Sequence, residues 1–173
     1  LERICVGLPG ARWIDPEQYH LTLRFIGEVD GLVTRDIEAG LAEVDFEPFT
    51  LELRGFGHFP PRGEPKVLWA GVSPTDQVEP LRRAVDRAVN AAGVQQERRK
   101  FHPHVTVARF PSGAPIQRLQ RFLAGHALYR SEPFVVDSFH LYSSQLHQDG
   151  ALHTLEVSYG PNEPEEDDWF RSS

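Results

Sequence analysis

Two short stretches of the chain carry the same pattern of histidine and threonine. His20-Leu21-Thr22-Leu23 recurs as His104-Val105-Thr106-Val107, and each copy lies in a run typical of a β-strand. Residues two apart in a strand point the same way, so each motif presents an imidazole beside a hydroxyl. An imidazole titrates near neutral pH, and a hydroxyl can donate to a phosphate oxygen. The two motifs therefore predict acid–base chemistry on a phosphate.

The repetition carries the prediction, because one histidine-threonine pair alone would be weak. A pseudo-two-fold arrangement of the two strands would line one cleft with both pairs. One histidine could then act as general base and the other as general acid. The alternative interpretation is that His20 and His104 are ordinary, partly buried strand residues.

The patterns around the motifs predict an α+β fold with largely antiparallel strands. Tyr19–Ile26 alternates as a strand does, and Asp76–Ala92 carries the apolar stripe of a helix that Gly93 ends. Thr75 or Asp76 is expected to cap this helix. The other expected strands are Arg3–Leu8, Phe49–Phe59, Lys66–Val72, His102–Phe110, Phe134–Ser143 and Leu152–Tyr159, and the other helices are Val33–Val44 and Pro115–Leu123.

Length and composition exclude several classes of protein. The 173 residues suit one domain, and the single cysteine excludes a disulfide framework and a zinc site built on several thiolates. No apolar run approaches the roughly 18 residues of a membrane span. The net charge of −7 argues against a sequence-independent DNA coat. The absence of methionine indicates a missing N-terminal residue. No signal peptide is visible, so we expect a cytoplasmic protein. We also expect a monomer.

The chain is expected to divide into a bilobal domain, residues 1–160, and an acidic tail, residues 161–173. The tail holds five of the acidic residues and one arginine, so the remaining body has a net charge of −3. Arg24, Arg109 and Arg98–Lys100 are expected to provide local positive charge beside the motifs. The acidity of the whole chain is therefore compatible with a phosphate ligand.

The connection after the first predicted strand is unusually short. Leu8-Pro9-Gly10-Ala11-Arg12-Trp13 joins that strand almost directly to the segment before the first histidine. We expect that residues are absent near Gly10–Arg12, either deleted from the chain or omitted from its description.

The motifs and their flanks resemble a known group of enzymes. YHLTLRFIGEV and FHPHVTVARF look like the paired motifs of the 2H phosphoesterase superfamily, and are most similar to bacterial RNA 2′,3′-cyclic phosphodiesterases, historically named 2′-5′ RNA ligases. The resemblance extends from about Arg3 to Tyr159. It implies two pseudo-symmetric lobes of antiparallel sheet, with flanking helices, around a central cleft. The chain departs from the family in lacking a helix between the first strand and the first motif.

The resemblance also implies the role of each site residue. His20 would be the general acid that protonates the departing ribose O3′, and His104 the general base that activates water. The product would be a 2′-phosphomonoester, and the reverse reaction would join a 5′-hydroxyl in a 2′-5′ linkage. The substrate contacts implied are phosphate contacts by Thr22, Thr106 and Arg109 and base stacking by Phe25.

No cofactor and no metal are implied by the resemblance. His102 and His104 form a His-x-His pair that could chelate a metal, but few nearby acidic or cysteine residues would complete such a site. The expected partners are RNA or nucleotide 2′,3′-cyclic phosphate ends, and no membrane.

Alternative functions remain open at this point. Within the superfamily, the substrate could instead be ADP-ribose 1″,2″-cyclic phosphate or 2′-5′ oligoadenylate. An RNA-end binding module with little turnover is the alternative from another class, although the presence of both histidines disfavours it.

Three groups near the motifs have two interpretations each. Trp13 and Tyr19 could pack in the core or stack on a base. His58 and Phe59 could serve packing or border the cleft. Arg98–Lys100 could be a solvated face or could steer RNA.

Overall fold

The computed structural model describes residues 1, 7–147 and 150–161. The predicted strand Arg3–Leu8 therefore lies mostly outside the described residues. The strands are β1 (Arg12–Trp13), β2 (Phe49–Phe59), β3 (Val67–Ser73), β4 (His104–Arg109), β5 (Phe134–Val136), β6 (Phe139–His147) and β7 (Gly150–Tyr159). The helices are α1 (Gly31–Ala42), α2 (Val78–Ala91) and α3 (Ile116–Gly125), with short 3₁₀ turns η2 (Pro16–Gln18) and η3 (Thr75–Gln77).

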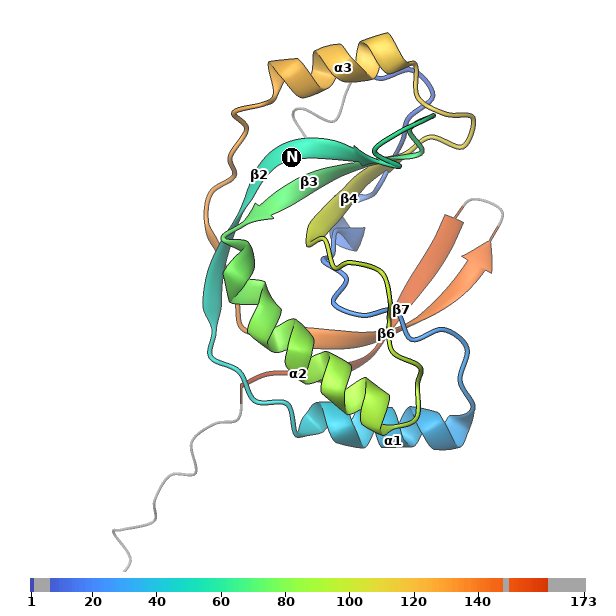
Figure 1. Ribbon diagram of the computed structural model, residues 1–173, viewed down its shortest axis with the longest axis vertical. Helices are drawn as coiled ribbons and strands as arrows, with labels where there is room; N and C mark the ends of the chain where they lie inside the picture. The colour runs from blue at the N-terminus through green and yellow to red at the C-terminus, as the bar shows by residue number, and fades with distance from the viewer. Residues whose placement is uncertain (2–6, 148–149, 162–173) are drawn as a thin grey trace, which may run out of the picture.

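The strands form two antiparallel sheets of unequal size. The larger has the order β1-β4-β3-β2-β5, and the smaller is the β6-β7 hairpin. Helix α3 lies at one end of the molecule and α1 at the other, with α2 crossing in front (Figure 1). The predicted α+β fold with two lobes of antiparallel sheet and flanking helices is thus confirmed, with five strands in one lobe and two in the other.

The first hydrophobic cluster lies between the larger sheet and α3. Alternate residues of β3 point into it, because successive side chains of a strand face opposite sides of the sheet. The rings of Trp13 and Phe56 pack against Phe122 of α3. The packing interpretation of Trp13 and Tyr19 is therefore confirmed, because both pack against this cluster.

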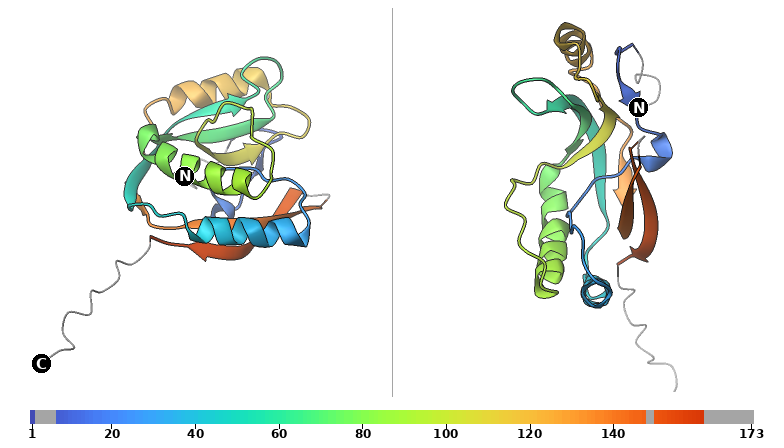
Figure 2. Two further views of the ribbon diagram at one scale, coloured as in Figure 1. Left: turned by 60° about the horizontal axis from the view of Figure 1, so that its bottom comes forward. Right: turned by 90° about the vertical axis from the view of Figure 1, so that its right-hand side faces the viewer.

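The second hydrophobic cluster joins α1 and α2 to the hairpin. Helices α1 and α2 lie together beside β6 and β7 (Figure 2). The ring of Phe139 stacks on that of Tyr159, whose hydroxyl donates to the Glu38 carbonyl on α1 at 3.3 Å. Leu23 and Phe49 pack against both clusters. The two lobes therefore share part of their cores.

Helix α2 follows the predicted apolar stripe, and its start differs from the prediction. Buried residues recur along it at helical spacing: Val78, Leu81, Val85 and Val89. The residue before the helix is Gln77, without a side-chain cap, because η3 occupies Thr75 and Asp76. Gly93 has φ +91°, a conformation that glycine adopts without strain, and it follows the helix as predicted.

The short connection after Leu8 is a closed turn. The Ala11 N–H donates to the Leu8 carbonyl at 3.2 Å, and Gly10 has φ +77°, which glycine tolerates. The connection is therefore a hydrogen-bonded turn, and the absence of residues near Gly10–Arg12 stays a prediction. Between residues 7 and 20 the only helical element is the single turn η2.

The predicted strand Tyr19–Ile26 is also wrong in extent. Only Leu21 forms a ladder contact, an isolated antiparallel bridge with Val105. The chain bends at Leu23 and runs on without regular structure to α1. The first motif is therefore an extended segment laid along β4.

Within the residues that the structure describes, no helix is long and apolar enough to cross a membrane.

Candidate active site

The two motifs meet at their central residues. Leu21 pairs with Val105 in an antiparallel bridge, and each is the residue between a motif's histidine and threonine. In an antiparallel pair the neighbours run past one another, so His20 lies towards Thr106 and Thr22 towards His104. The structure thus brings the two predicted pairs together about a local pseudo-two-fold axis.

Both histidines are held in the same way. The Nδ1 of His20 lies 2.8 Å from the Gln18 carbonyl, and the Nδ1 of His104 lies 2.6 Å from the His102 carbonyl. A carbonyl oxygen can only accept, so each Nδ1 must carry the proton in the bond. The Nε2 atom of each ring is then free to accept a proton when the ring is neutral, and to donate one when it is charged.

His104 lies against an aromatic wall. The rings of Phe59, Trp69 and His102 lie 5.1, 6.0 and 6.0 Å from its ring, between centroids. Gly57 leaves room for this wall, because a Cβ there would lie 2.2 Å from Trp69 Cζ2. Phe59 therefore borders the site, which is the second of the two interpretations of this residue.

The surroundings of His104 disfavour its charged form. Burial lowers its pKa below the ordinary 6.5, the bond to the His102 carbonyl opposes the shift, and positive charge on His102 and His20 adds to it. The ring is therefore neutral at neutral pH, as a general base must be.

His20 lies at the exposed side of the site, beside a residue that the motifs do not include. The ring of His153 on β7 meets its ring edge to face, with centroids 5.0 Å apart. Burial lowers the pKa of His153, and positive charge on His20 and Arg109 adds to the shift. His153 was missed because no spacing motif marks it, and only the placement of β7 beside the first motif reveals it.

A β-bulge turns Arg109 towards the site. Leu68 pairs with Ala108 and Trp69 with Thr106, so Val107 is an extra residue in β4. Val107 and Ala108 are both buried, and Arg109 is exposed. Without the bulge, Arg109, which is the fifth residue after His104, would lie on the opposite face of the strand. The positive charge of Arg109 helps to lower the pKa of His153, which agrees with a position on the site face.

The remaining predicted site residues are Thr22, Thr106 and Phe25, for which the described part of the structure gives burial but no specific polar contact. Thr22 and Thr106 are half-buried within the paired motifs. The Phe25 side chain is 64% exposed and belongs to neither hydrophobic cluster. The base-stacking role of Phe25 stays a prediction.

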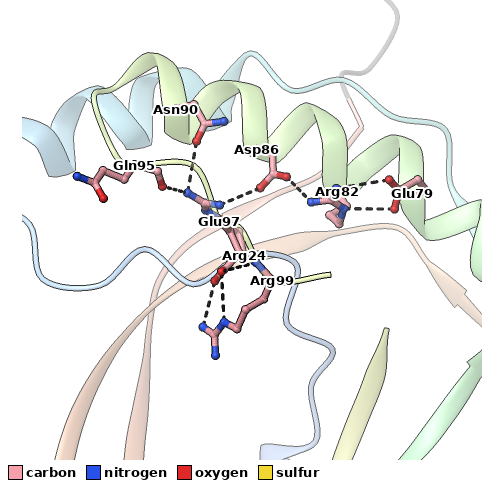
Figure 3. A network of polar contacts seen from close by, with 8 residues as sticks. All are labelled: Arg24, Glu79, Arg82, Asp86, Asn90, Gln95, Glu97 and Arg99. Carbon is pink, nitrogen blue, oxygen red and sulfur yellow. Dashed lines mark hydrogen bonds and ion pairs between the residues drawn. The ribbon is translucent and has the colours of Figure 1, made fainter. Parts of the chain in front are cut away.

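Arg24 does not add charge to the site, contrary to expectation. Its side chain is 3% exposed and lies under α2, where Nη1 is 3.6 Å from the Asp86 carboxylate (Figure 3). Its Nη2 also donates to Asn90 Oδ1 at 3.3 Å and to the Gln95 carbonyl. Alternation placed Arg24 on the face of His20, but the bend at Leu23 turns it into the second lobe. Arg24 therefore joins the first motif to α2.

The other charged and metal-binding candidates are Arg98–Lys100, His58 and His102, whose ring lies 6.0 Å from that of His104. Arg98–Lys100 is exposed, and Arg99 pairs with Glu97 at 3.0 Å, also drawn in Figure 3. His58 Nδ1 bonds to the Pro60 carbonyl at 2.9 Å. Among the described residues, no group of three histidine, cysteine, aspartate or glutamate side chains could hold a metal ion.

Comparison with known protein families gives one match over most of the chain. Residues 10–148 match the family described as the 2′-5′ RNA ligase superfamily. An RNA 2′,3′-cyclic phosphodiesterase of Aeropyrum pernix is 35% identical over 148 residues, which cover 85% of this chain and 84% of the relative. An RNA 2′,3′-cyclic phosphodiesterase of Bacillus subtilis is 31% identical, covering 80% of this chain and 77% of the relative.

Solved structures share the fold. A crystal structure from Thermus thermophilus superposes with a TM-score of 0.69 at 27% identity, covering 88% of this chain and 82% of that one. The Escherichia coli LigT structure, crystallised with 3′-AMP, gives a TM-score of 0.70 at 23% identity, covering 89% of this chain and 83% of that one.

Proposed function

Because this chain belongs to the 2′-5′ RNA ligase superfamily, we propose that it opens 2′,3′-cyclic phosphates of RNA or nucleotides to 2′-phosphomonoesters. The names of the relatives from Aeropyrum pernix and Bacillus subtilis support this substrate class. The observation that carries the proposal is the matched pair His20 and His104. Both rings are fixed through Nδ1, and their motifs are joined by the Leu21–Val105 bridge.

In the proposed mechanism His104 is the general base. Its depressed pKa keeps the ring neutral, so Nε2 can take a proton from water as the water oxygen attacks phosphorus. His20 is the general acid and gives its Nε2 proton to the departing ribose O3′. The P–O3′ bond breaks, and the phosphate remains on O2′.

The phosphate oxygens would be held by neutral and charged donors. Thr22 and Thr106 offer hydroxyl protons, one from each motif, to the non-bridging oxygens. Arg109 offers a planar guanidinium, which matches phosphate geometry. Phe25 remains the proposed base-stacking residue.

The test is turnover of nucleoside 2′,3′-cyclic phosphates and of RNA oligonucleotides that end in a cyclic phosphate, with EDTA present. We expect a 2′-monoester product, and a loss on the order of 10²–10⁴ in rate for His20→Ala and for His104→Ala. His140→Ala is the matched control, because His140 bonds to Ser158 on the hairpin and should leave the rate unchanged.

Each other outcome would contradict a defined part of the proposal. Binding of these substrates without turnover would indicate an RNA-end binding module. Turnover of only ADP-ribose 1″,2″-cyclic phosphate or 2′-5′ oligoadenylate would change the substrate class. Loss of activity in EDTA with recovery on adding a metal would overturn the two-histidine mechanism.

A further inference from the structure

His153 reaches the site from the smaller sheet. It lies on β7, whereas His20 precedes the bridge to β4, and the two rings meet edge to face at 5.0 Å between centroids. This ring contact links the hairpin lobe directly to a residue of the first motif.

The register of the hairpin explains why His153 faces the site. Tyr159 and Val157 pack into the second cluster, on the side of α1 and α2. The register then shifts, because Val157 pairs with Leu141 but Leu155 pairs with Tyr142, so Glu156 is an extra residue. Leu155 is 51% exposed, which agrees with a face turned away from the helices. His153, two residues further, shares that face.

The chemistry of the ring suits a contact with an anion. Burial and the positive neighbours His20 and Arg109 lower the pKa of His153, so the ring is neutral at neutral pH, with one N–H donor and one acceptor nitrogen. A neutral ring does not compete with His20 for the proton that His20 must donate. Among the described residues, no hydrogen bond occupies the ring nitrogens of His153, whereas Nδ1 of His20 and of His104 is bonded.

We propose that His153 is a third substrate-contacting histidine of the site, donating a ring N–H to a non-bridging oxygen of the phosphate that His20 and Arg109 flank. The proposal rests on the proposed function for the identity of the substrate. It assigns His153 a binding role, with proton transfer left to His20 and His104.

Two variants separate binding from packing. His153→Phe keeps an aromatic ring against His20 and removes both nitrogens, and His153→Gln keeps a donor and removes the ring. Loss of a hydrogen bond to a charged group should raise KM by about 10- to 100-fold in the phenylalanine variant. Its kcat should stay within about threefold, because the contact is made in both the ground state and the transition state. The glutamine variant should recover part of the loss.

A binding measurement removes the dependence on turnover. Isothermal titration with a nucleoside 2′-monophosphate should show a similar loss of affinity in His153→Phe. The matched control is His140→Phe, the same substitution on the other strand of the hairpin, where His140 bonds to Ser158. This control should keep the affinity and the KM of the original chain.

The possible failures are distinguishable. If the original chain turns over the cyclic substrate but His153→Phe keeps its KM and affinity, the binding role is wrong. If His153→Phe behaves like the original chain and His153→Gln has a reduced kcat, His153 only packs against His20, and the binding role is wrong. If the original chain turns over no cyclic phosphate, the proposed function fails, and the titration still reports whether His153 binds the monoester.

Discussion

At the scale of single residues, the burial of His104 sets the pH range in which the site can work. A general base must be neutral, and a lowered pKa keeps the ring neutral down to a lower pH. We therefore expect the acidic limb of the kcat/KM profile to lie below the ordinary histidine pKa of 6.5. The measurement is kcat/KM for a nucleoside 2′,3′-cyclic phosphate as a function of pH.

A variant that exposes His104 to water tests whether burial lowers its pKa. Phe59→Ala removes a ring that lies 5.1 Å from the His104 ring, so the acidic limb should move back towards higher pH. Phe46→Ala is the matched control, because it removes a ring from the second cluster and should leave the limb in place. An acidic limb above pH 6.5 in the original chain would contradict the assignment of His104 as the buried base.

Sequence spacing could predict the motif residues but not all of their neighbours. An i, i+2 pair in an extended chain points one way whatever the rest of the fold does, so His20 with Thr22 and His104 with Thr106 could be paired in advance. The face of the sheet on which Arg109 lies depends on the bulge at Val107, and no local sequence pattern predicts this bulge. A site residue supplied by a distant strand, such as His153, depends on tertiary packing alone.

At the scale of elements, the buried contact between Arg24 and Asp86 ties the first motif to α2. Asp86→Asn would remove the carboxylate that lies 3.6 Å from the Arg24 guanidinium, which is 3% exposed, and that also pairs with Arg82. Removing one partner of a buried pair typically costs about 3–5 kcal/mol. We take about 3 kcal/mol as the expected loss of unfolding free energy, because Asp86 is 17% exposed. Denaturant unfolding at neutral pH measures it.

The same helix provides a matched exposed pair. Arg83 is 66% exposed and lies 3.0 Å from Glu79. Arg83→Gln should change the unfolding free energy by less than about 1 kcal/mol, because water screens surface ion pairs. Equal losses in the two variants would mean that the contact of Arg24 with α2 is no more important than a surface pair.

Elements whose apolar residues recur at a regular spacing could be predicted from the sequence, and elements shaped by tertiary contacts could not. The stripe of α2 and the alternation of β2 and β3 specify buried faces from local sequence, and their predicted ranges are nearly those observed. Tyr19–Ile26 alternates equally well, but only Leu21 finds a ladder partner, and Arg24 turns away to α2. The predicted cap of α2 also failed, because η3 takes up Thr75 and Asp76.

At the scale of the whole molecule, both described hydrophobic clusters are built from residues up to Tyr159. We expect a chain without residues 162–173 to keep its melting temperature and its kcat for a cyclic mononucleotide. Its net charge would be −3 instead of −7, so KM for an RNA oligonucleotide should fall at low salt. Thermal unfolding and steady-state kinetics at low and high salt measure these effects.

Salt provides the control for this charge effect. Screening shortens the reach of exposed charges to about 8 Å at physiological ionic strength, so the difference in KM should shrink as salt is added. A lower melting temperature in the shortened chain would show that the terminal residues contribute to the fold, and would contradict the division into a body and a tail.

The identical restraint on His20 and His104 bears on the direction of the reaction. Each ring is fixed through Nδ1 to a carbonyl two residues earlier, so nothing in this restraint commits one ring to give a proton and the other to take it. Ligation by a 5′-hydroxyl breaks the same P–O3′ bond as hydrolysis, so in both reactions one ring takes the proton of the nucleophile and the other protonates O3′. By microscopic reversibility, cleavage of the 2′-5′ linkage back to the cyclic phosphate exchanges these two roles. On the proposed function, hydrolysis and ligation would then share one geometry, and the outcome would depend on which nucleophile, water or a ribose 5′-hydroxyl, occupies the place beside phosphorus.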